Sequence, residues 1–153
     1  MIQRSLYLIV QRLYELRQTN VSNVNNIPKI PDKHVKPTEN MVEIFPNCGF
    51  FISATLKTLI NAKYAENNDW KIIVRETLLD VYGNGMVHFS ATGKGSNSRP
   101  AINKKLFDGL LGWVNQGKNG ANLISRKDLV TEINHAISNK RDYKKRKLVS
   151  TDQ

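Results

Sequence analysis

Three prolines in a short, asparagine-rich stretch constrain the folding of this chain more than any other feature. Pro28, Pro31 and Pro37 lie within residues 19–40. Proline lacks the backbone N–H that a helix interior or a central strand needs, so neither element is expected there. The stretch is therefore predicted to be a flexible linker, which separates an N-terminal segment of residues 1–18 from a folded domain that begins after residue 40.

The N-terminal segment has apolar residues at the spacing of an amphipathic helix. Its apolar positions alternate in steps of four and three, and they are Ile2, Leu6, Ile9, Leu13 and Leu16. This spacing is typical of a helical seam that packs on another helix. The sequence leaves three partners open: the chain's own domain, a second copy, or a helix of another protein.

Two short apolar stretches predict a small hairpin at the start of the domain. Residues 41–45 and 50–53 flank Pro46-Asn47-Cys48-Gly49, a composition typical of a turn. Ser53 can then cap the next helix.

Four amphipathic helices are predicted after the hairpin, because apolar residues recur at steps of three and four. In chain order their apolar faces comprise Leu56, Leu59, Ile60 and Tyr64; Trp70, Ile73, Val74, Thr77, Leu78 and Val81; Leu106, Phe107, Leu110, Leu111 and Val114; and Leu129, Ile133, Ala136 and Ile137. Trp113 is expected in the core. The predicted fold class is mainly α, a compact bundle of about five helices with a minor hairpin.

Positive charge is concentrated in the second half of the chain. The 153 residues have a formal net charge of +10, and residues 93–147 contain 13 Lys or Arg against four acids. Nearly all of the excess charge therefore lies there. Such a basic region favours a polyanionic partner, either a nucleic acid or an anionic membrane surface.

Several enzyme classes and metal sites are disfavoured by the residues present. One cysteine, Cys48, and three scattered histidines do not have the spacing of a zinc site. Lys94 is followed by Gly95, whereas a nucleotide-binding Walker loop requires Ser or Thr after the lysine. No two acids stand together in the basic half, as metal-assisted cleavage would need. We expect no enzymatic activity, no metal and no cofactor.

Two parts of the basic half are candidates for contact with a polyanion. Residues 90–100 form a Gly/Ser-rich loop with two cations and no acid, which suits either phosphate contact or a plain solvated loop. The last helix is predicted to begin at Ser125, with Asp128 completing a capping box. Its outer face carries amide, hydroxyl and guanidinium groups, and a basic tract over residues 140–147 follows. DNA reading, a nuclear import signal and a solvated surface all remain open for this helix.

Residues 89–95, Phe-Ser-Ala-Thr-Gly-Lys-Gly, and 99–106, Arg-Pro-Ala-Ile-Asn-Lys-Lys-Leu, resemble the BEN domain. Members of that family carry a Ser-x-Thr-Gly-Lys loop followed by Ala-Leu-Asp-Pro-x-Lys-Leu. This chain has Ile102-Asn103-Lys104 where Leu-Asp-Pro is usual, and Asn103 can still cap a helix. The resemblance covers residues 41–147 and leaves residues 148–153 as a disordered tail.

The resemblance implies an all-α domain in which the last helix enters the DNA major groove while nearby loops hold the backbone. Carried over by position, the residues expected to read bases are Asn134, Ser138, Asn139 and Arg141. Those expected to contact phosphate are Lys94, Ser96, Arg99, Lys140, Lys144, Lys145 and Arg146.

The expected function is sequence-specific binding of double-stranded DNA in the nucleus, in transcriptional regulation, with repression expected, or in chromatin organisation. Residues 1–18 would pair with a second copy to give a homodimer, or with another chromatin protein. No membrane and no small-molecule substrate are expected. The alternative is a protein–protein adaptor of chromatin complexes whose basic tail is only a nuclear localisation signal.

Overall fold

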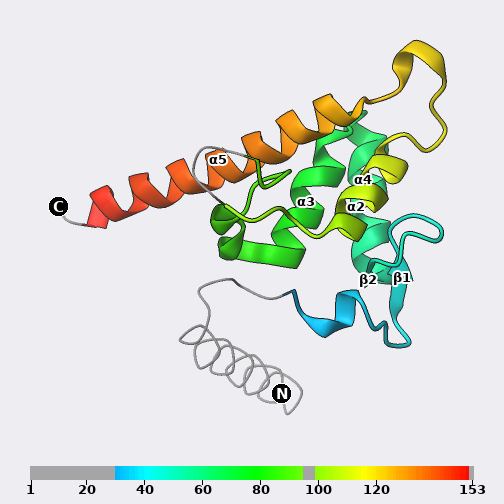
Figure 1. Ribbon diagram of the computed structural model, residues 1–153, viewed down its shortest axis with the longest axis horizontal. Coiled ribbons are helices and arrows are strands. Elements are labelled where there is room, and N and C mark those ends of the chain that lie inside the picture. Colours follow the sequence, from blue (N-terminus) through cyan, green and yellow to red (C-terminus); the bar gives the residue numbers. More distant parts are fainter. Residues whose placement is uncertain (1–29, 95–98, 152–153) are drawn as a thin grey trace.

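The computed structural model describes residues 30–94 and 99–151. In this part of the chain a two-stranded sheet is followed by four α-helices (Figure 1). The helices are α2 (Ala54–Asn67), α3 (Lys71–Tyr82), α4 (Lys104–Val114) and α5 (Arg126–Thr151). Short 3-10 helices precede the sheet (η1, Asp32–His34), follow α3 (η2, Gly83–His88) and follow α4 (η3, Gly120–Asn122). The prediction of a mainly helical fold with a minor hairpin is confirmed. The expected helix over residues 2–16 lies outside the described residues.

The predicted hairpin is present at the start of the fold. Strands β1 (Met41–Glu43) and β2 (Phe51–Ser53) pair antiparallel, with Val42 opposite Ile52. Asn47 and Gly49 in the turn both have positive φ, a conformation that asparagine and glycine adopt most readily. The Gly49 N–H donates to the Glu43 carboxylate at 2.9 Å, so a side chain of β1 holds the turn closed.

Side-chain caps begin three of the helices at the expected positions. The Ser53 hydroxyl accepts from the Leu56 N–H at 3.0 Å at the start of α2. Asn103 accepts from the N–H groups of the first turn of α4. Ser125 and Asp128 bond reciprocally at the start of α5, which is the predicted capping box. Each cap satisfies backbone donors that a helix leaves unpaired at its N-terminus.

One continuous core joins all of these elements. It contains the apolar faces predicted for α3, α4 and α5, and Trp113 lies within it as expected. The indole N–H of Trp113 donates to the Asn61 side chain of α2 at 3.1 Å. One predicted core position is wrong: Leu59 has helical spacing with Ile60 but is 56% exposed, because no other described element covers this side of α2.

The packed part of the chain begins earlier than the sequence predicts. Ile30 packs against the core, and His34 of η1 is fully buried although both lie in the stretch predicted to be a linker. The ring of His34 stacks on Phe50 and donates from Nδ1 to the Phe51 carbonyl at 2.7 Å. Proline excludes a helix here but not a turn of 3-10 helix that docks on β2.

The C-terminal end also differs from its prediction. Residues 148–153 are expected to be a disordered tail, yet α5 continues past Lys147 to Thr151. The basic tract is thus the second half of a 26-residue helix, and this half extends beyond the rest of the molecule in Figure 1. None of the helices in the described residues is both long and apolar enough to cross a bilayer.

Candidate nucleic-acid interface

Residues 90–94 and 99–101 are the described ends of the segment that we call the basic loop, because it carries Lys94 and Arg99. Its two ends are held together by a parallel bridge between Ser90 and Ala101. The Ser90 N–H donates to the Pro100 carbonyl, and the Ile102 N–H donates to the Ser90 carbonyl, both at 2.9 Å. The ends of the loop are therefore fixed to each other by backbone bonds that no local sequence pattern predicts.

The side chain of Ser90 ties the first turn of the basic loop to its last residues. Its hydroxyl accepts from the Gly93 N–H at 2.8 Å and donates to the Arg99 carbonyl at 3.3 Å. Gly93 has φ +72°, and a Cβ at this position would lie 3.1 Å from the Ala101 nitrogen. Glycine is required here for both its conformation and its size. The Ser-x-Thr-Gly-Lys motif thus encodes a closed turn that presents Lys94.

Helix α4 begins directly after the basic loop at a fixed position. The Asn103 N–H donates to the Tyr82 hydroxyl oxygen at 3.0 Å, and the Tyr82 ring packs against Phe89 with centroids 4.5 Å apart. Burial raises the pKa of Tyr82, and the hydrogen bond from Asn103 opposes that rise. Tyr82 therefore stays a neutral phenol that connects the end of α3 to the start of α4.

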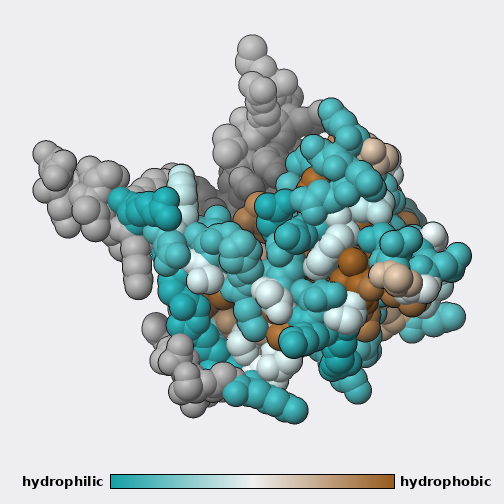
Figure 2. All heavy atoms as spheres, turned by 90° about the horizontal axis from the view of Figure 1, so that it is seen from above, coloured by the Kyte–Doolittle hydropathy of each residue, from teal (hydrophilic) through white to brown (hydrophobic). Residues whose placement is uncertain are grey.

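Helix α5 is fixed to the body by its first half. Leu129, Ile133, Ala136 and Ile137 are buried, and this face packs on α3 and η2. The opposite side of the helix faces solvent. Figure 2 looks onto the side of the molecule that carries α5, and this surface is mainly hydrophilic with only small separate hydrophobic areas.

One hydrogen bond joins the basic loop to α5. The N–H of Ala91, a buried residue, donates to the Asn134 side-chain oxygen at 2.9 Å. The oxygen of Asn134 is therefore used within the protein. This bond connects residues 43 positions apart and holds the start of the basic loop beside α5.

The residues predicted to read bases lie on two neighbouring stripes of α5. Asn134, Ser138 and Arg141 follow one another at steps of four and three, so they lie along one line of the helix. Asn139 is rotated by about 100° from Ser138 and shares its stripe with Arg146. Asn134 and Asn139 are exposed, whereas Ser138 and Arg141 are half-buried.

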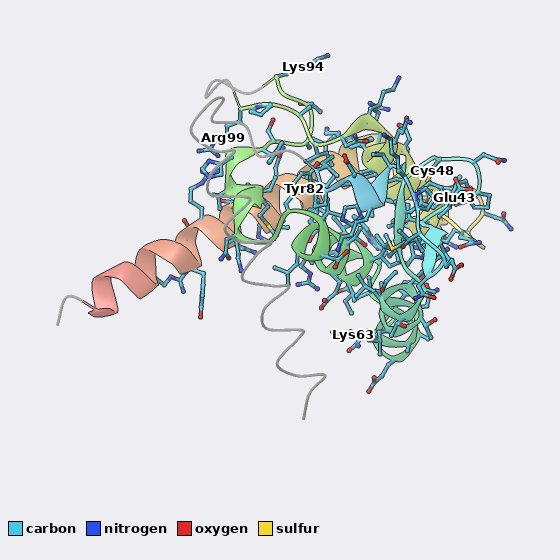
Figure 3. All side chains as sticks on the ribbon, turned by 90° about the horizontal axis from the view of Figure 1, so that it is seen from below. Glu43, Cys48, Lys63, Tyr82, Lys94 and Arg99 are labelled. Atoms are coloured by element: carbon cyan, nitrogen blue, oxygen red, sulfur yellow. The ribbon has the colours of Figure 1, made fainter. Side chains whose placement is uncertain are left out.

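Four of the seven predicted phosphate-contacting residues have side chains in the described part of the chain. Lys94 is exposed and Arg99 half-buried on the basic loop, and both lie on the same side of the molecule in Figure 3. Lys140 is half-buried and Arg146 exposed on α5. Ser96 lies outside the described residues. The backbone of Lys144 and Lys145 belongs to α5, while their side chains lie outside the described part.

None of the ion pairs found among the described residues involves a lysine or arginine of the basic loop or of α5. The two pairs between permanently charged groups are Lys63–Glu76 at 3.1 Å and Arg75–Asp69 at 3.5 Å. Both lie on α2, α3 and the turn between them. Within the described part of the chain, no acid lies within ion-pair distance of Lys94, Arg99, Lys140, Arg141 or Arg146. Unpaired cations on one surface produce a positive potential that attracts polyanions.

Other cations that could be counted from sequence are used in packing. Arg126 lies over the Phe107 ring at 4.6 Å, and Lys118 lies over the Tyr64 ring at 5.9 Å. Lys57 donates to the Glu43 carbonyl and lies over Trp113. Aromatic faces attract such cations. No group of His, Cys, Asp or Glu that could hold a metal ion occurs among the residues that the structure describes.

Comparisons with known proteins find similarity at the level of the fold. No protein-family model matches the sequence, and no curated protein matches it. Among solved structures, the chain is similar to the insv-BEN domain complexed to its DNA target site, with a TM-score of 0.53 and 18% sequence identity. The match covers 72% of this chain and 96% of that chain. The chain therefore has a BEN-like fold, as the sequence resemblance implied.

Proposed function

We propose that this chain binds double-stranded DNA through the surface formed by the basic loop and the outer face of α5. The observation that carries the proposal is the set of cations on that surface that have no acidic partner among the described residues. The hydrogen bond between Ala91 and Asn134 holds the start of the basic loop beside α5. An α-helix fits the major groove of B-DNA. The similar insv-BEN domain was solved with its DNA target site, which supports the same partner here.

The surface suggests a division of labour between two kinds of contact. Lys94, Arg99, Lys140 and Arg146 would contact phosphates and give affinity that falls with salt, since each neutralised phosphate releases counterions. Asn134, Ser138, Asn139 and Arg141 would supply base recognition, because amide and guanidinium groups bond base edges in the major groove. The Asn134 oxygen is already bonded to Ala91, so its amide N–H groups are the ones left for a base.

We further propose that binding serves transcriptional regulation, with repression expected, or chromatin organisation in the nucleus. A polybasic helix that reads a duplex would also serve as an import signal. The adaptor alternative uses the same basic helix for import alone and leaves the domain without DNA affinity. Binding by the purified protein therefore separates the two functions.

The deciding experiment is selection from a random duplex library with the full chain at about 150 mM salt, where non-specific binding is weak. We expect one short enriched motif, and a palindromic motif would indicate two copies on one site. Enrichment without a motif would remove base reading from the proposal. No retention of any duplex would overturn it in favour of the adaptor.

Single variants then test the two kinds of contact on the selected site and on a scrambled duplex. Arg146→Ala should weaken both duplexes equally and lower the salt slope by about one. Asn139→Ala should cost roughly 1–3 kcal/mol on the selected site alone. If both variants lost affinity equally on both duplexes, the division of labour would be wrong.

A further inference from the structure

A second part of the surface, away from the basic loop, carries two large apolar side chains that no described element covers. Leu59 of α2 is 56% exposed and Leu79 of α3 is 46% exposed, although leucine side chains at helical positions are usually buried. The neighbouring pair Lys63–Glu76 joins the same two helices at 3.1 Å. Figure 3 shows Lys63 on the opposite side of the molecule from Lys94.

The Lys63–Glu76 pair fixes how the two leucines lie relative to each other. Helices α2 and α3 are joined by a short turn and contact each other. The Lys63–Glu76 pair joins residues at similar distances from that turn, so the two helices run in opposite directions. Leu59 lies one turn before Lys63, and Leu79 lies one turn after Glu76. Both steps lead away from the turn, so the two leucines lie side by side at the same level of the helix pair.

Val35 extends this apolar surface toward the point where the described chain begins. Val35 is 37% exposed and directly follows the buried His34. Helix η1 packs on β2, and β2 leads directly into α2, so η1 lies near the N-terminal half of α2, which carries Leu59. We call the surface formed by Val35, Leu59 and Leu79 the apolar face.

The N-terminal segment has the length and pattern to cover this surface. Its seam residues Ile2, Leu6, Ile9, Leu13 and Leu16 would lie along one side of a helix about 22 Å long. Helix α2, with 14 residues, is about 21 Å long. Residues 19–29 can span roughly 35 Å when extended, which is enough to return residues 1–18 to either end of α2.

The positions of charged residues also favour packing of the N-terminal segment on the apolar face. Arg75 pairs with Asp69 and Lys63 pairs with Glu76, whereas no ion pair of Asp80 is found in the described part of the chain. Arg12 flanks the apolar seam of the N-terminal segment. A cation at the edge of the docked helix would complement the unpaired carboxylate beside Leu79.

We propose that residues 2–16 form a helix that docks, within the same chain, on the apolar face of Val35, Leu59 and Leu79. The helix would complete a layer with α2 and α3 and bury the seam and the two leucines together. The basic loop and α5 would stay free, because they lie on the other side of the molecule. This inference is independent of the proposed DNA binding.

Paramagnetic broadening in the full-length chain tests the proposal. A nitroxide is attached to a Gln11→Cys variant, since Gln11 lies on the opposite side of the predicted helix from the seam. Cys48→Ser removes the native thiol, and a serine hydroxyl can replace its contacts with the Phe50 backbone. We expect loss of the amide signals of Leu59, Lys63 and Leu79, and retention of those of Ala91 and Lys94. Retained signals on α2 and α3 would overturn the proposal.

Two sets of variants make the result specific. Leu6→Glu with Leu13→Glu, or Leu59→Glu with Leu79→Glu, should restore the lost signals. The matched controls, Gln3→Glu with Gln18→Glu and single Ala65→Glu, should not. Because Leu59 and Leu79 are exposed, the domain should still fold, and the remaining spectrum reports that directly. Broadening that persists in either leucine double variant would overturn the proposal.

A mixed sample decides which chain provides the helix. Spin-labelled protein without isotope is mixed with ¹⁵N-labelled protein without spin label. We expect no loss of signal in the mixture, since the helix and the face belong to one chain. Loss of the Leu59 and Leu79 signals in the mixture would show that a second copy covers the face, and docking within the chain would be wrong.

Discussion

Cations on the two sides of the molecule have different surroundings. On the side of α2 and α3, Lys63 and Arg75 are paired with acids. On the side of the basic loop and α5, no ion pair of Arg99, Lys140 or Arg146 occurs among the described residues. Net charge alone does not identify a binding surface, since a cation paired with an acid adds less to the local potential than an unpaired one. Lys71 of α3 also has no ion pair among the described residues, so the contrast concerns Lys63 and Arg75 and supports the basic loop and α5 as the surface whose charge acts on a partner.

The largest expected effect is on duplex affinity, when three cations are removed either from the side of the basic loop and α5 or from the side of α2 and α3. Arg99→Ala, Lys140→Ala and Arg146→Ala together should lower duplex affinity on the order of 100-fold at about 150 mM salt and reduce the salt slope by about three. Lys63→Ala, Lys71→Ala and Arg75→Ala remove equal charge and should change affinity little. Fluorescence anisotropy titrations over a salt series measure both. Equal losses for the two triple variants would mean that total charge, and not its placement, determines binding.

A smaller effect is expected from disturbing the conformation of the basic loop without changing its charge. Gly93→Ala should cost about 2 kcal/mol of unfolding free energy, because its positive φ is strained for alanine and its Cβ would crowd the Ala101 nitrogen. Gly117 has φ +79° but open space around a Cβ, so Gly117→Ala should cost only about 1 kcal/mol. Urea unfolding compares the two. Equal costs would show that the bridge to Ala101 does not hold the loop.

The bond between loop and helix can be removed separately. Asn134→Ala should cost about 1–2 kcal/mol, because the buried Ala91 N–H loses its acceptor. Asn134→Asp keeps an acceptor at the same place and should retain most of this stability. Amide hydrogen exchange at Ala91 gives a direct measurement. Unchanged protection in Asn134→Ala would separate the basic loop from α5 and weaken the contrast between the two sides.

The smallest expected effect is a pH dependence of the unfolding free energy, caused by the buried His34 near the α2–α3 side. Burial lowers the pKa of His34 below its usual value of 6.5, and the hydrogen bond to the Phe51 carbonyl and the charge of Asp80 only partly oppose this. Below pH 6.5 the unfolded chain therefore takes up a proton more readily than the folded chain. Stability should fall as the pH drops from 6.5 toward the folded pKa, by at most about 1.4 kcal/mol per pH unit for one proton. Urea titrations at pH 7.0 and 5.5 measure this loss, and His34→Gln should reduce it. An identical pH dependence in His34→Gln would contradict the assignment.

Local chemistry made the helices predictable from sequence. Ser53, Asn103 and the Ser125–Asp128 pair cap helices at the expected positions because capping needs only a side chain and the next backbone N–H groups. The hairpin followed in the same way from its turn residues. The family resemblance added the BEN-like fold, which the solved insv-BEN structure confirms.

Contacts between distant residues were not predictable. His34 is buried because it reaches a carbonyl 17 residues away, and prolines around it suggested a linker. Asn134 looked like a free base-reading group, but its oxygen bonds Ala91 across 43 residues. Helical spacing cannot tell whether a neighbouring element covers a residue, so Leu59 was expected in the core. The basic residues were visible in the sequence, whereas their lack of acidic partners required coordinates.

The parallel bridge at Ser90 and Ala101 has a consequence for how such a protein can diverge. Because backbone bonds on both sides of the loop fix its ends, insertions or exchanges between Lys94 and Arg99 need not disturb α4 or α5. Mutations in that interval would change what the loop offers to a partner at little expense to stability. Related chains could thus acquire new preferences by altering the length of one short segment on a constant scaffold.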